Sequence, residues 1–218
     1  RDRNYTVGGL NPYAVEAAVK LGVKEVFLPT YSSKNHLSRF RHKRKIFPYP
    51  LPEESEGISV LDQSSLKKEI HEIMDIISGS KVILGTGHIS PLESKRVVEE
   101  SVNRGVKILI THPLSALIQM PLELLKELTS RKNVWAEFTY LSCTPTIEPH
   151  ISYADLARAI RSIGAENTIL STDLGQPYNP SPVDGMKRLI RGLLKEGISK
   201  VDLIKILHEN PEILLEVS

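Results

Sequence analysis

The pattern that most constrains this chain is an alternation of short apolar segments with longer amphipathic ones. The short segments are rich in β-branched residues and too short to be helices. We interpret them as five buried strands: Val23–Leu28, Lys81–Leu84, Val106–Ile110, Val134–Phe138 and Thr168–Ser171. Such strands are typical of a parallel sheet that is covered on both faces.

The longer segments carry the local signals of helices. Most of them open with a side chain that caps a helix, often followed by proline, and several close near glycine. The predicted starts are Asn11–Pro12, Ser64 or Ser65, Ser90–Pro91, Pro121, Ser152, Ser181–Pro182, Ser199 and Asn210–Pro211. Strand followed by helix, five times over, indicates parallel strands with crossover helices and therefore the α/β class. Two architectures fit, a (β/α)₈ barrel and an open doubly-wound sheet.

Length and composition narrow the class of protein. The 218 residues suffice for a single domain spanning residues 1–218, although a full barrel takes about 250 residues. The lone cysteine, Cys143, excludes a disulfide within the chain and favours a reducing compartment. No apolar run approaches the roughly 18 residues of a membrane span, and the polar start carries no signal peptide. We therefore expect a cytoplasmic protein that does not bind a membrane, and the abundance of Lys, Glu and Ile fits a thermophilic source.

The charge pattern indicates few macromolecular partners. The net charge of +2 does not discriminate between classes of ligand. One dense basic run, Arg39–Lys45, is interpreted as a solvated loop, with an anion-binding or nucleic-acid patch as the alternative. We expect a small-molecule substrate, no nucleic acid and, as a further possibility, a homo-oligomer.

Polar residues follow most of the predicted strands at the point where each strand ends. His88, His112 and Asp173 come after the second, third and fifth strands. Because the carboxyl ends of parallel strands form the active-site face of α/β folds, these three side chains are candidate metal ligands. Two imidazoles and a carboxylate suit Zn²⁺ first, with Mn²⁺, Fe²⁺ or Ni²⁺ as alternatives. Taken singly, each residue also fits an ordinary hydrogen-bonded loop or turn position.

Residues beside these strand ends are predicted to contact the substrate: Asn35, His36, Thr86, Gly87 and Gln176. His36 also fits a metal ligand or a plain loop residue. The other four histidines, His42, His71, His150 and His208, are interpreted as structural or solvated.

With these motifs in view, the chain resembles the amidohydrolase superfamily of metal-dependent hydrolases, which are (β/α)₈ barrels. The stretches that resemble a less-studied branch of it are Gly8–Pro12, Thr111–Pro113, Ser171–Pro177 and the terminal His208–Pro211. Counted from Asp173 on strand eight, Glu137 falls on strand seven, His112 on six and His88 on five. The chain would then cover strands three or four to eight, and Asn210 would cap the last helix.

The resemblance implies a reaction and a role for each residue. A water activated by the metal would attack an amide, lactone or related ester or imide bond. Asp173 would take the proton from that water and return it to the leaving group. His88 would bind metal, and His112 would bind metal or steady the transition state. The family's His-x-His pair on strand one is absent from these residues. Since the chain begins at Arg1, we expect preceding residues to supply that pair.

Other activities remain open on the same scaffold. A metal-dependent decarboxylase or a phosphoesterase would use similar ligands, although a phosphoesterase of the histidine-rich barrel type would need more strand-end histidines. A catalytically degenerate paralogue that binds a partner is the non-enzymatic alternative.

Overall fold

A computed structural model describes residues 7–40 and 56–216 of the chain. These residues fall into two compact units, Arg1–Ile110 and Thr111–Ser218, which are described separately. The prediction of a single domain stays a prediction. No helix in either described range is both long and apolar enough to cross a membrane.

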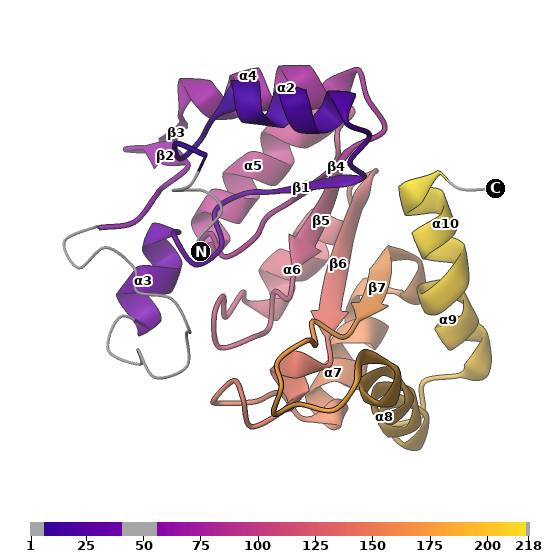
Figure 1. Cartoon of the computed structure of the whole chain (residues 1–218). Coiled ribbons are helices and arrows are strands. Elements are labelled where there is room, and N and C mark those ends of the chain that lie inside the picture. The colour runs from indigo at the N-terminus through magenta and orange to yellow at the C-terminus, as the bar shows by residue number, and fades with distance from the viewer. Residues whose placement is uncertain (1–6, 41–55, 217–218) are drawn as a thin grey trace. The chain divides into compact units, whose positions relative to one another are not determined.

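The first unit is built on three parallel strands. β1 (Glu25–Phe27) pairs with β4 (Ile83–Gly85), and β4 pairs with β5 (Lys107–Thr111), as Figure 1 shows. A short antiparallel hairpin, β2 (Leu61–Asp62) and β3 (Ser65–Leu66), lies between β1 and β4 in the sequence. The strand order therefore follows the chain order, as the alternation predicted.

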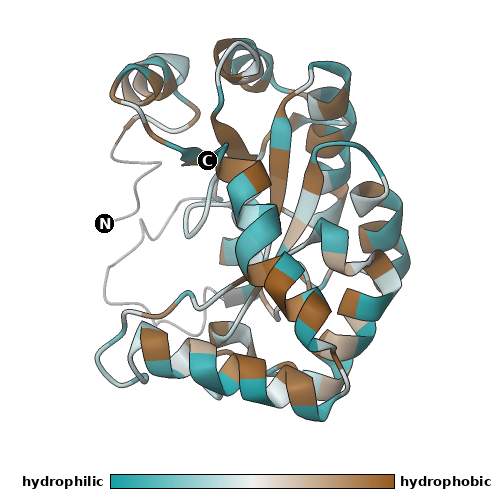
Figure 2. Ribbon diagram, turned by 90° about the vertical axis from the view of Figure 1, so that its right-hand side faces the viewer, coloured by the Kyte–Doolittle hydropathy of each residue, from teal (hydrophilic) through white to brown (hydrophobic). Residues whose placement is uncertain are grey.

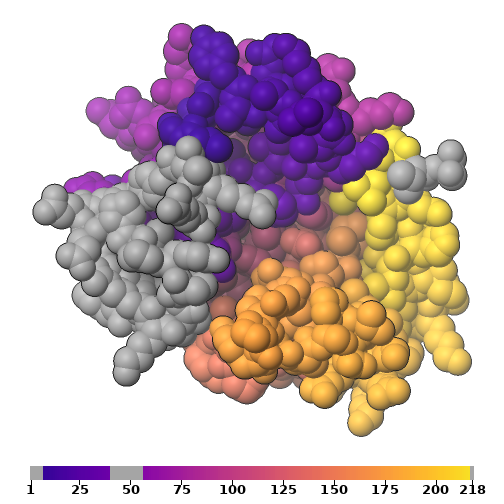
Figure 3. Space-filling model, in the orientation of Figure 1, coloured from indigo at the N-terminus to yellow at the C-terminus, as the bar shows by residue number. Residues whose placement is uncertain are grey.

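The described residues of this unit form four helices: α2 (Pro12–Lys20), α3 (Lys34–Phe40), α4 (Lys68–Ser78) and α5 (Pro91–Asn103). Helices α2 and α4 lie side by side in Figure 1, but they differ in how much of their surface is buried. The apolar stripe of α4 is buried, whereas α2 has no buried residue and its atoms lie at the surface in indigo in Figure 3. The α4 stripe consists of Ile70, Ile73, Met74 and Ile77.

The second unit begins at the end of β5 and contains two more parallel strands, β6 (Val134–Thr139) and β7 (Thr168–Ser171). Its helices are α6 (Leu122–Thr129), α7 (Tyr153–Ile163), α8 (Pro182–Lys195), α9 (Lys200–Ile204) and α10 (Asn210–Leu215). Short irregular turns complete it: η2 (Leu141–Cys143), η3 (Ala165–Asn167) and η4 (Lys205–Glu209). Figure 2 shows hydrophobic and hydrophilic residues alternating along the helices, as amphipathic segments require.

The local helix signals are largely confirmed. Ser90 begins α5 with a full capping box, in which its side chain and that of Glu93 each bond the backbone of the other. Ser152, Ser181 and Ser199 cap their helices in the predicted places. The α/β class with parallel strands and crossover helices is confirmed within each unit.

Three predictions about local structure are wrong. The helix predicted from Ser64 or Ser65 begins at Lys68, because Ser65 and Leu66 form the second strand of the hairpin. The connection Tyr31–Gln63 after β1, which the clustered prolines Pro48, Pro50 and Pro52 predict to be irregular, contains helix α3. Asn210 does not cap α10; its amide instead donates to the carbonyl oxygens of Ala165 and Thr168, both at 2.7 Å.

Some predictions fall on residues that the structure does not describe. Counting the barrel strands back from Asp173 predicts that Tyr5–Val7 falls at the end of strand three. Of these residues Tyr5 and Thr6 lie outside the described ranges, as do His42 and the part of the basic run beyond Phe40. Within the described part of that run, the Arg39 guanidinium donates to the Asn35 side-chain oxygen at 3.1 Å.

Candidate functional site

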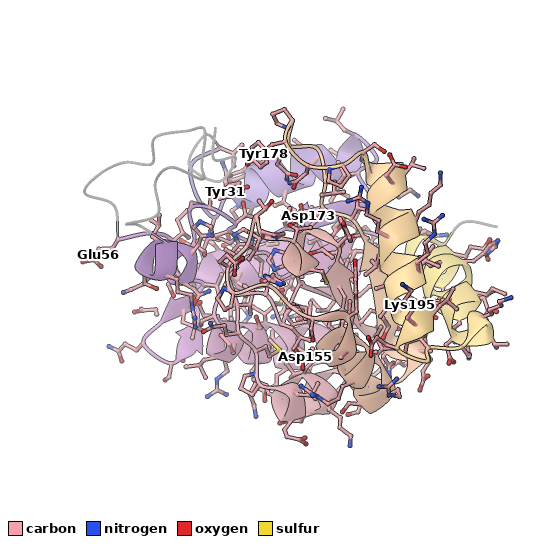
Figure 4. The ribbon with its side chains drawn as sticks, turned by 90° about the horizontal axis from the view of Figure 1, so that it is seen from below. Tyr31, Glu56, Asp155, Asp173, Tyr178 and Lys195 are labelled. Carbon is pink, nitrogen blue, oxygen red and sulfur yellow. The ribbon has the colours of Figure 1, made fainter. Side chains whose placement is uncertain are left out.

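Each of the three predicted metal ligands lies just beyond the carboxyl end of a parallel strand. His88 follows β4 after Thr86 and Gly87, His112 follows β5 directly, and Asp173 follows β7 after Thr172. These are the positions that the strand alternation predicted. Asp173 is labelled in Figure 4.

In the first unit, the backbone of His88 is held from three directions. The Ser33 hydroxyl and the Asn35 amide both donate to the His88 carbonyl oxygen, at 2.8 and 3.0 Å. The His88 backbone N–H donates to the Pro29 carbonyl oxygen at 2.9 Å. All of these partners come from the segment that follows β1. Asn35, predicted to contact substrate, therefore anchors the chain at His88.

His36 lies against His88. Nδ1 of His36 is 2.8 Å from Nδ1 of His88, and both residues are buried. The ring of Tyr31 meets both imidazoles edge-on, with centroids 5.2 Å from His36 and 5.6 Å from His88. Tyr31, labelled in Figure 4, also lines a cavity of about 490 Å³ between α2 and β1. The structure thus joins His36 to His88 as a buried pair.

Gly87 and Thr86 connect β4 to His88. Gly87 adopts a φ of +60°, and Thr86 is buried with its N–H donated to the Leu109 carbonyl oxygen at 3.0 Å. A side chain on Gly87 would meet the backbone of Leu28 and Pro29, so the protein's own chain requires glycine here. Contacts of Thr86 and Gly87 with substrate stay predictions.

In the second unit, His112 is buried and its backbone has a φ of +29°. The Ser115 hydroxyl lies 3.1 Å from Nδ1 of its ring. Burial lowers the pKa of the His112 imidazole to about 4, although a backbone hydrogen bond opposes the shift. The ring is therefore uncharged at neutral pH and keeps a nitrogen lone pair.

Asp173 also has a positive φ, of +53°. Although the residue is exposed, the surrounding protein removes much of the water from its carboxyl group. This desolvation, and secondly the charge of Glu137, raise the pKa of Asp173 to about 6. Burial likewise raises the pKa of Glu137, against a hydrogen bond from Ser171 that lowers it. The charge of Glu137, a residue of β6, therefore favours the protonated form of the Asp173 carboxyl group beyond the end of β7.

Gln176 supports the loop that carries Asp173. Its side-chain amide donates to the Asp173 carbonyl oxygen at 3.1 Å and accepts from Asn179 at 2.9 Å. Its predicted contact with substrate stays a prediction, while its role in holding this turn is visible.

No group of three or more His, Cys, Asp or Glu side chains in residues 7–40 and 56–216 is arranged to hold a metal ion. The structure brings His36 together with His88, and Asp173 together with Glu137. Sequence reasoning left Tyr31, Ser33, Ser115 and Glu137 out of the predicted site. Tyr31 and Ser33 share the polar segment after β1 with His36, and this shared segment was the available signal.

Solved structures with a similar fold include proteins that are named as hydrolases. The crystal structure of an amidohydrolase from Pseudomonas aeruginosa matches with a TM-score of 0.64 at 15% identity, over 94% of this chain and 68% of that one. A Pseudomonas putida protein assigned as a 2-pyrone-4,6-dicarboxylic acid hydrolase matches with a TM-score of 0.52 at 16% identity, over 94% and 68%. At these identities the likeness shows the fold alone, and that fold agrees with the predicted α/β class of (β/α)-barrel proteins.

Similarity in sequence, unlike the likeness in fold, identifies a protein family. No curated protein matches it significantly. The model of one protein family, described as a family of unknown function, matches residues 3–137, which is more than half of the chain. The chain therefore belongs to this family, DUF6282.

Proposed function

We propose that this protein is a metal-dependent hydrolase in which His88, His112 and Asp173 bind a divalent cation, with Zn²⁺ the first choice. The observation that carries the proposal is the backbone conformation at the strand ends. Among the six non-glycine residues of the described ranges with positive φ, His112 and Asp173 follow the parallel strands β5 and β7. Such conformations cost on the order of 1 kcal/mol or more each and cluster at functional sites.

The donor set fits a borderline divalent cation. His112 offers a buried, uncharged imidazole, and Asp173 offers the carboxyl group of an exposed residue in the loop that follows β7. Imidazole nitrogens combined with carboxylate oxygen suit Zn²⁺, and also Mn²⁺, Fe²⁺ or Ni²⁺. When bound, such a cation supplies Lewis acidity, which lowers the pKa of water and polarises a carbonyl group.

The residues of this chain supply the proton transfers and the positioning. Asp173 accepts the proton of the attacking water and passes it to the leaving group. The charge of Glu137 raises the pKa of Asp173, so the Asp173 carboxyl group holds a proton more readily. Ser115 orients the His112 ring through its hydrogen bond to Nδ1.

The bond that is hydrolysed is proposed from the relatives and from the resemblance. The two similar structures are named as an amidohydrolase and a dicarboxylic acid hydrolase. We therefore propose an amide, lactone, ester or imide bond in a small molecule. A decarboxylase, a phosphoesterase or a degenerate binding protein are the outcomes to be separated by experiment, and a cytoplasmic location stays a prediction.

The test combines metal binding with turnover. Purified protein is stripped of metal, titrated with Zn²⁺, Mn²⁺, Fe²⁺ or Ni²⁺, and assayed on a panel of amides, lactones and esters. Asp173→Asn should keep the fold and lower turnover by a factor of about 10² or more. His208→Gln is the matched control, because His208 is exposed and pairs only with Glu212 among the described residues, at 3.2 Å. Protein that binds none of the four cations and hydrolyses nothing in their presence would refute the proposal.

A further inference from the structure

The His36–His88 pair must share a proton. Its two Nδ1 atoms are 2.8 Å apart, a hydrogen-bond distance. Two unprotonated nitrogens at that distance would set lone pair against lone pair, and two protonated ones would set hydrogen against hydrogen. One ring therefore donates Nδ1–H and the other accepts it.

The two rings meet edge to edge through these nitrogens. Their planes are 16° apart and their centroids 4.9 Å apart. The Nδ1 atoms are much closer than the centroids, and closer than the roughly 3.5 Å at which stacked aromatic atoms touch. The short contact therefore lies in the plane of the rings, where the nitrogen lone pairs point, and is a hydrogen bond rather than a stacking contact.

The surroundings fix this arrangement. His36 and His88 are 1% and 7% exposed, so water competes little for the shared proton. The Ser33 hydroxyl accepts from the His36 backbone N–H at 3.0 Å and donates to the His88 carbonyl oxygen at 2.8 Å. One serine thus ties the two backbones together. Because a buried charge is costly, a neutral pair with one proton on each ring is favoured.

The direction of donation decides which nitrogen of His88 keeps a lone pair. If His88 donates Nδ1–H, its Nε2 carries the lone pair; if His36 donates, Nε2 of His88 carries a proton. A metal ligand needs the first arrangement, and ligating histidines usually donate their other N–H to a neighbouring acceptor. His88 lies at the strand end, whereas His36 lies on helix α3.

We propose that His36 is a positioning residue that accepts the Nδ1–H of His88 and so holds His88 in the tautomer with its lone pair on Nε2. This role differs from the substrate contact predicted for His36. The shared proton follows from the pair's geometry, while its direction depends on the proposed function. His36 thereby supplies to His88 the orientation that a carboxylate supplies in many metal sites.

The first experiment reads the tautomers in metal-free protein, so it does not depend on metal binding or turnover. Long-range ¹H–¹⁵N spectra of uniformly ¹⁵N-labelled protein separate protonated from unprotonated ring nitrogens, and His36→Gln and His88→Gln assign the signals. We expect His88 to be protonated on Nδ1 and His36 on Nε2. Protonation of His88 on Nε2 with His36 on Nδ1, or independent rings without a shared proton, would overturn the inference.

The second experiment measures Zn²⁺ affinity by competition with a chromophoric chelator. His36→Leu removes the acceptor and should weaken binding about 10- to 100-fold. His36→Gln, whose side-chain oxygen can accept the same proton, should recover most of the loss. His208→Gln serves as the control for loss of an exposed histidine. Circular dichroism checks folding, and the Gln variant keeps the comparison decisive if the Leu variant unfolds.

The outcomes separate this inference from the proposed function. If His88→Leu weakens Zn²⁺ binding but His36→Leu does not, His36 has no positioning role and the hydrolase proposal stands. If His88→Leu leaves Zn²⁺ binding unchanged, His88 is not a ligand and both proposals fail at that residue. Equal losses in His36→Leu and His36→Gln would also contradict the inference, since acceptance of the proton would then not matter.

Discussion

A Cβ atom placed on Gly87 would clash with the carbonyl oxygen of Leu28. That contact involves backbone rather than a flexible side chain, so β1 or the turn before His88 would have to move. Gly87→Ala also places a side chain at a φ of +60°. We expect a loss of at least about 2 kcal/mol in the free energy of unfolding, measured by urea denaturation.

Gly22→Ala is the matched control for this prediction. Gly22 has a φ of +82° and no atom within 4 Å of an added Cβ, so it carries the conformational cost without the clash. A loss of about 1 kcal/mol is expected there. Equal losses in the two variants would show that the approach of Leu28 to Gly87 does not constrain the turn.

Glu93 connects the start of α5 to the hairpin segment. Its carboxylate accepts from the backbone and hydroxyl of Ser90, both at 2.8 Å, from the Ser59 hydroxyl at 2.7 Å and from the Val60 backbone at 3.1 Å. Glu93→Ala removes this buried carboxylate and leaves the four donors without this acceptor. We expect a cost of about 3 kcal/mol in thermal or urea unfolding. Asp184→Ala removes a similar but exposed partner of Ser181 and should cost only about 1 kcal/mol; similar costs would contradict the prediction.

Asn210 is a donor in a place where aspartate cannot serve. Its amide donates to two backbone carbonyl oxygens, those of Ala165 and Thr168, and the residue is buried. Asn210→Asp preserves shape but sets oxygen against oxygen, so we expect it to destabilise more than Asn210→Ala, by at least about 2 kcal/mol relative to wild type. Asn103→Asp, at the exposed end of α5, should stay within about 0.5 kcal/mol. The reverse order of the two Asn210 variants in urea unfolding would contradict this role.

Cys143 should be a slow nucleophile in the folded protein. Burial raises the pKa of its thiol to about 12, and its Sγ lies 3.9 Å from the Thr139 carbonyl oxygen as a weak donor. Since the thiolate is the reactive form, the native thiol should react with a disulfide reagent at pH 8 about 10³-fold more slowly than the unfolded chain. An unfolded thiol ionises near pH 9. This difference should reduce stability as pH rises from 9 toward 12. A native reaction rate that levels off below pH 9 would show an ordinary thiol.

The helix starts could be predicted because their causes are local. Ser90, Ser152, Ser181 and Ser199 each bond a backbone N–H three residues ahead, so the sequence around each serine contains the whole interaction. The helix start predicted at Ser64 or Ser65 was wrong because a serine before an apolar stripe also fits a hairpin. The strand that contains Ser65 is decided by pairing with Asp62 on the facing segment.

The candidate site also has features that could be predicted from the sequence and features that could not. The sequence by itself determined the alternation of strands and helices, and with it the placing of His88, His112 and Asp173 beyond strand ends, because these depend on near neighbours in the chain. Only the tertiary structure decided that His36 pairs with His88, 52 residues away, and that Asn210 bonds Thr168, 42 residues away. Such partners are selected by packing and burial, which arise after distant segments have come together.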